Sequence, residues 1–187
     1  MKIIPKGSYL VGIYGTYFLV FAMYIVAFVI MANAGIYNNY PYGYNPYGVN
    51  DEMMWVSVII MLLGFIPAVI SVVMWCILTH KLWAVIQGPS SRTTPGQAVG
   101  LMFVPFFNFY WCFQAIWGWS VDYNKHIKDN KVVVPPVSEG VGLAWCIVSC
   151  VGIIPFVGYL TLIPQLILMI IWHSQSIDAA NALIEKS

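Results

Sequence analysis

Long stretches without a charged residue constrain this chain more than any other feature of its sequence. The first runs from Tyr9 to Ala32 and the second from about Met53 to Thr79. Each is longer than the roughly 20 apolar residues that a helix needs to cross a bilayer. Of the 187 residues, 60% are hydrophobic and 8% are charged, whereas about a quarter of a soluble domain is charged. The sequence therefore predicts an all-α integral membrane protein, and it excludes a soluble domain, a disordered chain and a nucleic-acid partner.

A third apolar stretch covers residues 95–121 and is broken by proline. Thr94 and Gln97 have the spacing of a capping box, and Pro95 suits the first helical position, so a helix should begin there. Pro105 should interrupt that helix after about two and a half turns.

The last apolar stretch, residues 141–173, is too long for one straight span, because Val141 to Trp172 alone would extend about 48 Å against a core of about 30 Å. Pro155 and Pro164 should break it. It forms either two short helices in a hairpin or one strongly bent helix. An amphipathic tail helix is expected over residues 174–187.

Basic residues set the predicted orientation, because cytoplasmic loops collect Lys and Arg. Lys2 and Lys6 place the N-terminus in the cytoplasm, and the loop over residues 36–52, without Lys or Arg, lies outside. A third crossing would carry the lysines at 125, 128 and 131 outside, against this rule. We therefore expect residues 95–119 to form a re-entrant hairpin, in a single membrane domain over residues 1–187. The domain would have four to five helical membrane segments and both termini in the cytoplasm; four simple spans are the alternative.

Residues 94–124 carry a distinctive motif. It reads TPGxAVG over 94–100, VPFFNxYWxFQAxWG over 104–118 and DYN over 122–124. This motif resembles an uncharacterised family of bacterial multi-pass membrane domains, some of which are fused to a GYF-like domain. The resemblance implies a bacterial inner-membrane protein, and it implies no activity.

Four residues in and after the broken segment are candidates for a structural or functional role. Pro105 marks the break, and Asn108 and Gln114 are polar groups at membrane depth, where polar residues are costly and often functional. Asn108 can instead cap the following helix, and Gln114 can bond a neighbouring helix. Asp122 is expected to pair with Lys125 or to lie at the water interface.

Three histidines, His80, His126 and His173, are weak candidates for binding a cofactor such as haem. The alternative is that they lie at the membrane interface with polar tips in the headgroup region. No pair has the spacing of metal ligands on one helix, so we expect no metal site and no cofactor. No catalytic set of side chains can be assembled, and we expect no enzyme.

The outer loop contains five tyrosines among Pro, Gly and Asn, and three of them, Tyr42, Tyr44 and Tyr47, are candidates for binding a partner. Lying on lipid headgroups is the alternative. Few deep charges and short loops favour a small accessory or scaffold subunit, in contact with membrane lipids and with a larger complex or its own copies. A small carrier or channel-like protein is the alternative, because broken helices often mark transporter sites, although no inverted repeat is visible.

Overall fold

The structure is a computed structural model that describes residues 2–38, 49–88 and 91–186, with side chains from 2–33, 52–88 and 91–186. Every regular element in these ranges is a helix, as predicted. The elements are α1 (Lys6–Asn38), α2 (Val49–Val85), α3 (Pro95–Gly100), the 3₁₀ helix η1 (Leu101–Phe103), α4 (Phe107–Cys112), the π-helix η2 (Phe113–Trp117), α5 (Gly118–Asp129), α6 (Glu139–Val151) and α7 (Val157–Lys186).

Three of these helices are long and apolar enough to cross a membrane: α1, α2 and α7. The helices α1 and α2 extend beyond the predicted spans, 9–32 and 53–79, and take in both ends of the expected 36–52 loop. The helix α2 continues through Pro67. By its contacts the chain forms two compact units, unit 1 (residues 1–10 and 76–187) and unit 2 (residues 11–75).

Unit 2 is a pair of helical segments from α1 and α2, held by small and polar residues. Ser71 Oγ lies 3.2 Å from the Ile13 carbonyl oxygen and contacts the Thr16 hydroxyl. Tyr24 packs on Gly64, where an added Cβ would be 3.7 Å from the ring. Small residues allow such close helix contact in membranes. Its outward side chains are apolar, with Phe18 74% and Trp55 68% exposed.

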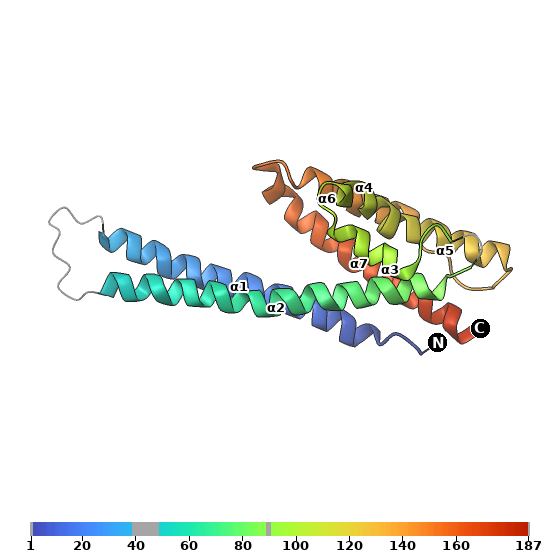
Figure 1. Cartoon of the computed structure of the whole chain (residues 1–187), viewed down its shortest axis with the longest axis horizontal. Helices are drawn as coiled ribbons and strands as arrows, with labels where there is room; N and C mark the ends of the chain where they lie inside the picture. Colours follow the sequence, from blue (N-terminus) through green and yellow to red (C-terminus); the bar gives the residue numbers. More distant parts are fainter. Residues whose placement is uncertain (1, 39–48, 89–90, 187) are drawn as a thin grey trace. The chain divides into compact units, whose positions relative to one another are not determined.

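Unit 1 contains two helical hairpins. In the first, α3 and η1 form a short leg, residues 104–106 form a turn, and α4, η2 and α5 form a long leg (Figure 1). The capping box at Thr94 and Gln97 and the start at Pro95 are confirmed. The helix breaks just before Pro105, which cannot donate a backbone hydrogen bond.

The second hairpin pairs α6 with α7 across a turn at residues 152–156. Of the two alternatives for residues 141–173, the structure has the pair of helices. Pro155 lies in the turn, whereas α7 continues through Pro164, so the expected break there was wrong. The tail is not a separate helix, because α7 runs on to Lys186 without a helix-breaking residue.

Both turns contain a phenylalanine at positive φ, Phe106 at 62° and Phe156 at 67°. Such a conformation costs a side-chain-bearing residue about 1–3 kcal/mol. Both turns lie at the same end of unit 1, opposite to the C-terminus (Figure 1).

The core of unit 1 lies between the hairpins and is aromatic. Trp119 and Trp172 are fully or almost fully buried, with ring centroids 5.9 Å apart. Trp172 Nε1 donates to Ser120 Oγ at 3.1 Å, which joins the two hairpins. Tyr123, also buried, has its hydroxyl 3.2 Å from the Pro135 and Ala179 carbonyl oxygens. Burial raises the pKa of Tyr123 to about 12, so its hydroxyl stays a hydrogen-bond donor at physiological pH.

Gly142 lets α6 approach the other hairpin closely, which gives a testable prediction. A Cβ there would lie 3.1 Å from Trp172 Nε1 and 3.2 Å from the backbone Cα of Trp117. Gly142→Ala should therefore lower stability by about 1–3 kcal/mol, measured as the unfolding midpoint in detergent. Gly96→Ala is the matched control, because Gly96 is also helical and has no atom within 4 Å of its Cβ position. It should be neutral or stabilising by up to about 1 kcal/mol. Equal effects of the two substitutions would contradict this packing.

Candidate functional site: the polar clamp of the two hairpins

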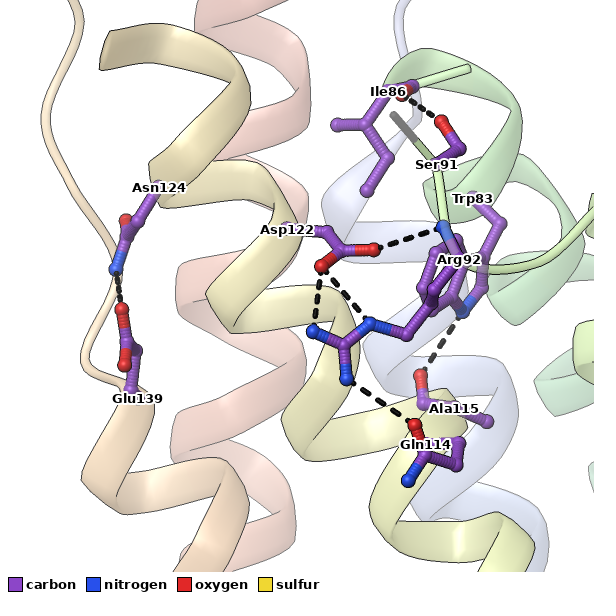
Figure 2. Close-up of polar contacts among 9 residues, drawn as sticks. All are labelled: Trp83, Ile86, Ser91, Arg92, Gln114, Ala115, Asp122, Asn124 and Glu139. Carbon is purple, nitrogen blue, oxygen red and sulfur yellow. Dashed lines mark hydrogen bonds and ion pairs between the residues drawn. The ribbon is translucent and has the colours of Figure 1, made fainter. Parts of the chain in front are cut away.

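An ion pair joins the two ends of the first hairpin. Arg92, just before α3, donates from Nε and Nη2 to Asp122 Oδ1 at 2.9 and 2.7 Å. Its backbone N–H donates to Asp122 Oδ2 at 3.3 Å. The Asp122 side chain is only 11% exposed and that of Arg92 31%. Figure 2 shows the guanidinium lying against the helix that carries Asp122.

The surface of the long leg is shaped to receive Arg92. Nη1 donates to Gln114 Oε1 at 3.2 Å. A Cβ on Gly118 would lie 2.9 Å from the same Nη1, so only glycine leaves this space open. Nearby, Trp83 Nε1 donates to the Ala115 carbonyl oxygen at 3.0 Å, within the π-helix η2 (Figure 2). Short π-helical segments are frequent at functional sites.

Three further contacts follow one pattern, in which a side-chain amide bonds both backbone groups of a residue distant in sequence. Asn124 pairs with Val137 at 2.9 and 3.0 Å. Gln175 pairs with Ser138 at 3.2 and 3.2 Å, and Asn181 pairs with Ile4 at 2.7 and 2.9 Å. We call these pairs and the Arg92–Asp122–Gln114 contacts the polar clamp.

The clamp fixes where the hairpins begin and end. Ser138 lies just before α6 and Gln175 lies in α7, so their contact joins the two legs of the second hairpin. Arg92 and Asp122 join the two legs of the first hairpin in the same way. Asn124 also donates to Glu139 Oε1 at 2.9 Å (Figure 2), which adds a link between the long leg of the first hairpin and the start of α6. Asn181 and the exposed Lys6–Asp178 ion pair hold the N-terminal segment on α7.

The clamp has the chemistry of a structural site. Each amide donates and accepts within the chain, and the charge of Asp122 is matched by Arg92. Among the side chains of residues 2–33, 52–88 and 91–186, no group of three His, Cys, Asp or Glu is arranged to hold a metal ion. The four cysteines, which lie in the described part of the chain, are free thiols.

The predicted residues separate into two places. Gln114 and Asp122 belong to the clamp, whereas Pro105 and Asn108 lie at the exposed turn of the first hairpin. The partner of Asp122 is Arg92 and not Lys125, because the hairpin brings the start of the segment back to α5. Gln114 likewise bonds Arg92 rather than a neighbouring helix.

The expected cap by Asn108 was wrong, because Phe106 is the N-cap residue of α4 and makes no side-chain cap bond. Asn108 comes two positions after the N-cap, as the second residue of the helix.

The three histidines have different surroundings. His80 is exposed and His126 half-buried, whereas His173 is fully buried and packs on Trp145 and Trp172. His173 Nδ1 donates to the Met169 carbonyl oxygen at 2.9 Å. The side chain of His173 therefore does not reach toward headgroups, because it is fully buried in the aromatic core. Tyr42, Tyr44 and Tyr47 lie outside the described residues.

Sequence reasoning missed Arg92, Asn124, Gln175 and Asn181 as site residues. A usable signal exists, since each is a polar residue next to the end of an apolar stretch. Their partners could not be read from the sequence, because the bonded residues are distant in the chain. The separation is at least 13 residues in every case, and it is 177 residues between Asn181 and Ile4.

No family model, no curated protein and no solved structure matches this chain. The resemblance of residues 94–124 to bacterial membrane domains therefore stays a prediction.

The clamp predicts unequal costs for removing two carboxylates. Asp122→Asn should lower stability by about 1–3 kcal/mol, because it takes the charge from a little-exposed acceptor of three Arg92 donors. Asp178→Asn is the matched control. Its ion pair with Lys6 has side chains 36% and 59% exposed, so the loss should be at most about 1 kcal/mol. Unfolding midpoints in detergent measure both, and a larger effect at Asp178 would contradict the assignment.

Proposed function

We propose that this protein is a non-catalytic scaffold or accessory subunit of a bacterial inner-membrane complex. The observation that carries this proposal is the use of the polar clamp side chains within the chain itself, where they hold its segments together. Outward side chains of α1 and α2 are by contrast large and apolar. Such a surface can meet membrane lipids, the helices of a larger complex or a second copy of the chain.

In this proposal residues 95–119 are re-entrant. The Arg92–Asp122 ion pair supports this topology, because a segment whose two ends bond each other at 2.7 Å begins and ends at the same membrane surface. The lysines at positions 125, 128 and 131 then remain on the cytoplasmic side with Arg92, as positive charges prefer.

Both termini lie on one side in the same proposal. Ile4 and Asn181 bond each other, as do Lys6 and Asp178. Lys2 and Lys6 favour the cytoplasm as that side. The motif at residues 94–124, similar to that of bacterial membrane domains, is the reason for naming the bacterial inner membrane.

A small carrier is the second candidate. The observation that favours it is the break at Pro105 followed by the π-helix η2, since interrupted helices form binding sites in transporters. Copurification distinguishes the two candidates, because a subunit needs a partner and a carrier does not.

Cysteine labelling tests the topology. In a chain whose native cysteines are replaced, Lys128→Cys should resist a membrane-impermeant thiol reagent applied to intact cells and react after permeabilisation. Asn45→Cys, in the loop expected outside, is the positive control and should react in intact cells. Labelling of Lys128→Cys from outside would overturn the re-entrant topology.

Copurification in a mild detergent, followed by mass spectrometry, tests the partner. We expect stoichiometric membrane proteins to accompany the wild-type chain. Changing Tyr42, Tyr44 and Tyr47 together to Ser should release an outer-face partner while leaving membrane insertion intact, because the aromatic rings are lost.

The matched control changes the same three tyrosines to Phe, which keeps the rings, and should retain the partner. Recovery of the wild-type chain as a clean monomer would contradict the subunit proposal. Unchanged copurification after the Ser substitutions would exclude the loop as the contact.

A further inference from the structure

The two hairpins of unit 1 have turns of the same kind. Residues 104–107 read Val-Pro-Phe-Phe and residues 154–157 read Ile-Pro-Phe-Val. In each, the N–H two residues after Pro105 or Pro155 donates to the proline carbonyl oxygen, at 2.7 and 2.9 Å. The next N–H donates to the carbonyl oxygen of the residue before proline, at 3.1 and 3.0 Å. The two turns therefore share sequence, hydrogen bonds and the positive φ of their phenylalanine.

Each turn satisfies all but one of its backbone N–H groups internally. Residues before and after the phenylalanine donate their N–H groups to carbonyl oxygens of the same turn or helix end. Proline itself has no N–H to satisfy. Within 104–109 and 153–158 of the described chain, the N–H groups outside this set of backbone bonds are those of Phe106 and Phe156. Backbone groups must be satisfied internally where lipid replaces water.

The phenylalanine rings point away from the protein. Phe106 is 87% and Phe156 84% exposed. Glycine would adopt the positive φ without strain, so the strained phenylalanine at both turns indicates a role for the ring itself. Transfer of such an exposed aromatic ring from water to apolar surroundings is favourable.

The legs of the hairpins reach about halfway through a bilayer. The six residues of α3 and three of η1 make a leg of about 15 Å, half of the hydrocarbon core of about 30 Å. In the second hairpin, α6 is apolar from Val141 to Val151, about 16 Å.

The lipid-facing part of the long leg of the second hairpin is longer than the short legs, but still shorter than the hydrocarbon core of about 30 Å. Trp172, Ile177 and Leu183 of α7 are buried in the core of unit 1. The part of α7 that is free to meet lipid therefore runs from Val157 to Ile171, about 22 Å. This part carries no charge, and the polar clamp holds its open end at Gln175.

We propose that the second hairpin is a structural repeat of the first, and that both turns insert Phe106 and Phe156 among the acyl chains of one leaflet, the cytoplasmic one. The ligand of this surface is the lipid acyl chain. In this arrangement α7 enters the bilayer and does not cross it, so that α1 and α2 alone span. The inference rests on the topology proposed above and requires no partner protein.

Depth-dependent quenching in reconstituted vesicles tests the insertion. A single cysteine replaces Phe106 or Phe156 in the chain lacking native cysteines, carries an environment-sensitive fluorophore, and is studied in phosphatidylethanolamine and phosphatidylglycerol vesicles. Val133→Cys is the matched control, because Val133 is apolar and 88% exposed but lies beside Lys131, away from the turns. A lipid spin label in mid-chain should quench positions 106 and 156 at least about twofold more than position 133, and aqueous iodide should quench position 133 alone.

Photo-crosslinking with the native cysteines present gives a second measurement, independent of the fluorophore. Benzoyl-phenylalanine at position 106 or 156 keeps an aromatic ring there, and irradiation of membranes should yield lipid adducts by mass spectrometry. Protein adducts at both positions would overturn the proposal in favour of a protein surface. Iodide quenching at positions 106 and 156 would overturn it by placing the turns in water.

These results are separable from the test of the subunit function. Lipid adducts together with a clean monomer would retain the inserted turns and contradict the subunit proposal. A stable partner together with iodide-accessible turns would do the reverse.

Discussion

The Arg92–Asp122 ion pair is the contact on which the arrangement of the first hairpin depends. It brings together residues that flank an apolar segment of some 27 residues, and Gln114 supplies a further acceptor on the long leg. Charge-assisted hydrogen bonds of this kind gain strength as water is removed from around them. The glycine at position 118 lets the guanidinium lie against the helix, so the pair becomes part of the packing as well as of the electrostatics.

The amide pairs extend the same principle to the rest of unit 1. A side-chain amide carries a donor and an acceptor, so it can satisfy both backbone groups of one residue at the end of a helix or in an extended segment. Asn124, Gln175 and Asn181 each do this for a residue that lies outside the helices. Because a buried backbone group without a partner is costly, these pairs favour one arrangement of the connections over others.

In unit 1 the side chains change character from the aromatic core, near the clamp, to the apolar turns. Near the clamp, Trp119, Tyr123 and Trp172 are buried by protein. Trp172 Nε1 donates to Ser120, and the Tyr123 hydroxyl lies within hydrogen-bond distance of backbone carbonyls. Toward the turns, the side chains from Phe103 to Tyr110 and from Ile153 to Phe156 are exposed and, apart from Asn108, largely apolar. The change from buried aromatic to exposed apolar side chains along the same helices is typical of a protein that is part in lipid and part outside it.

The sequence by itself determined the helical class, the two long apolar helices, the capped start at Pro95 and the break near Pro105, because each follows from local composition, capping or the missing N–H of proline. It could not determine the partner of Asp122, the burial of His173 or the end of α7, since these depend on which segments meet in space. The repeated turn shows most clearly which features the sequence determines and which depend on the tertiary structure. Pro-Phe at 105–106 and 155–156 can be read from the sequence, but their equivalence rests on backbone hydrogen bonds and positive φ. Those were decided by the tertiary structure, because only the packing of both legs of each hairpin can hold a phenylalanine in a conformation that its own backbone disfavours.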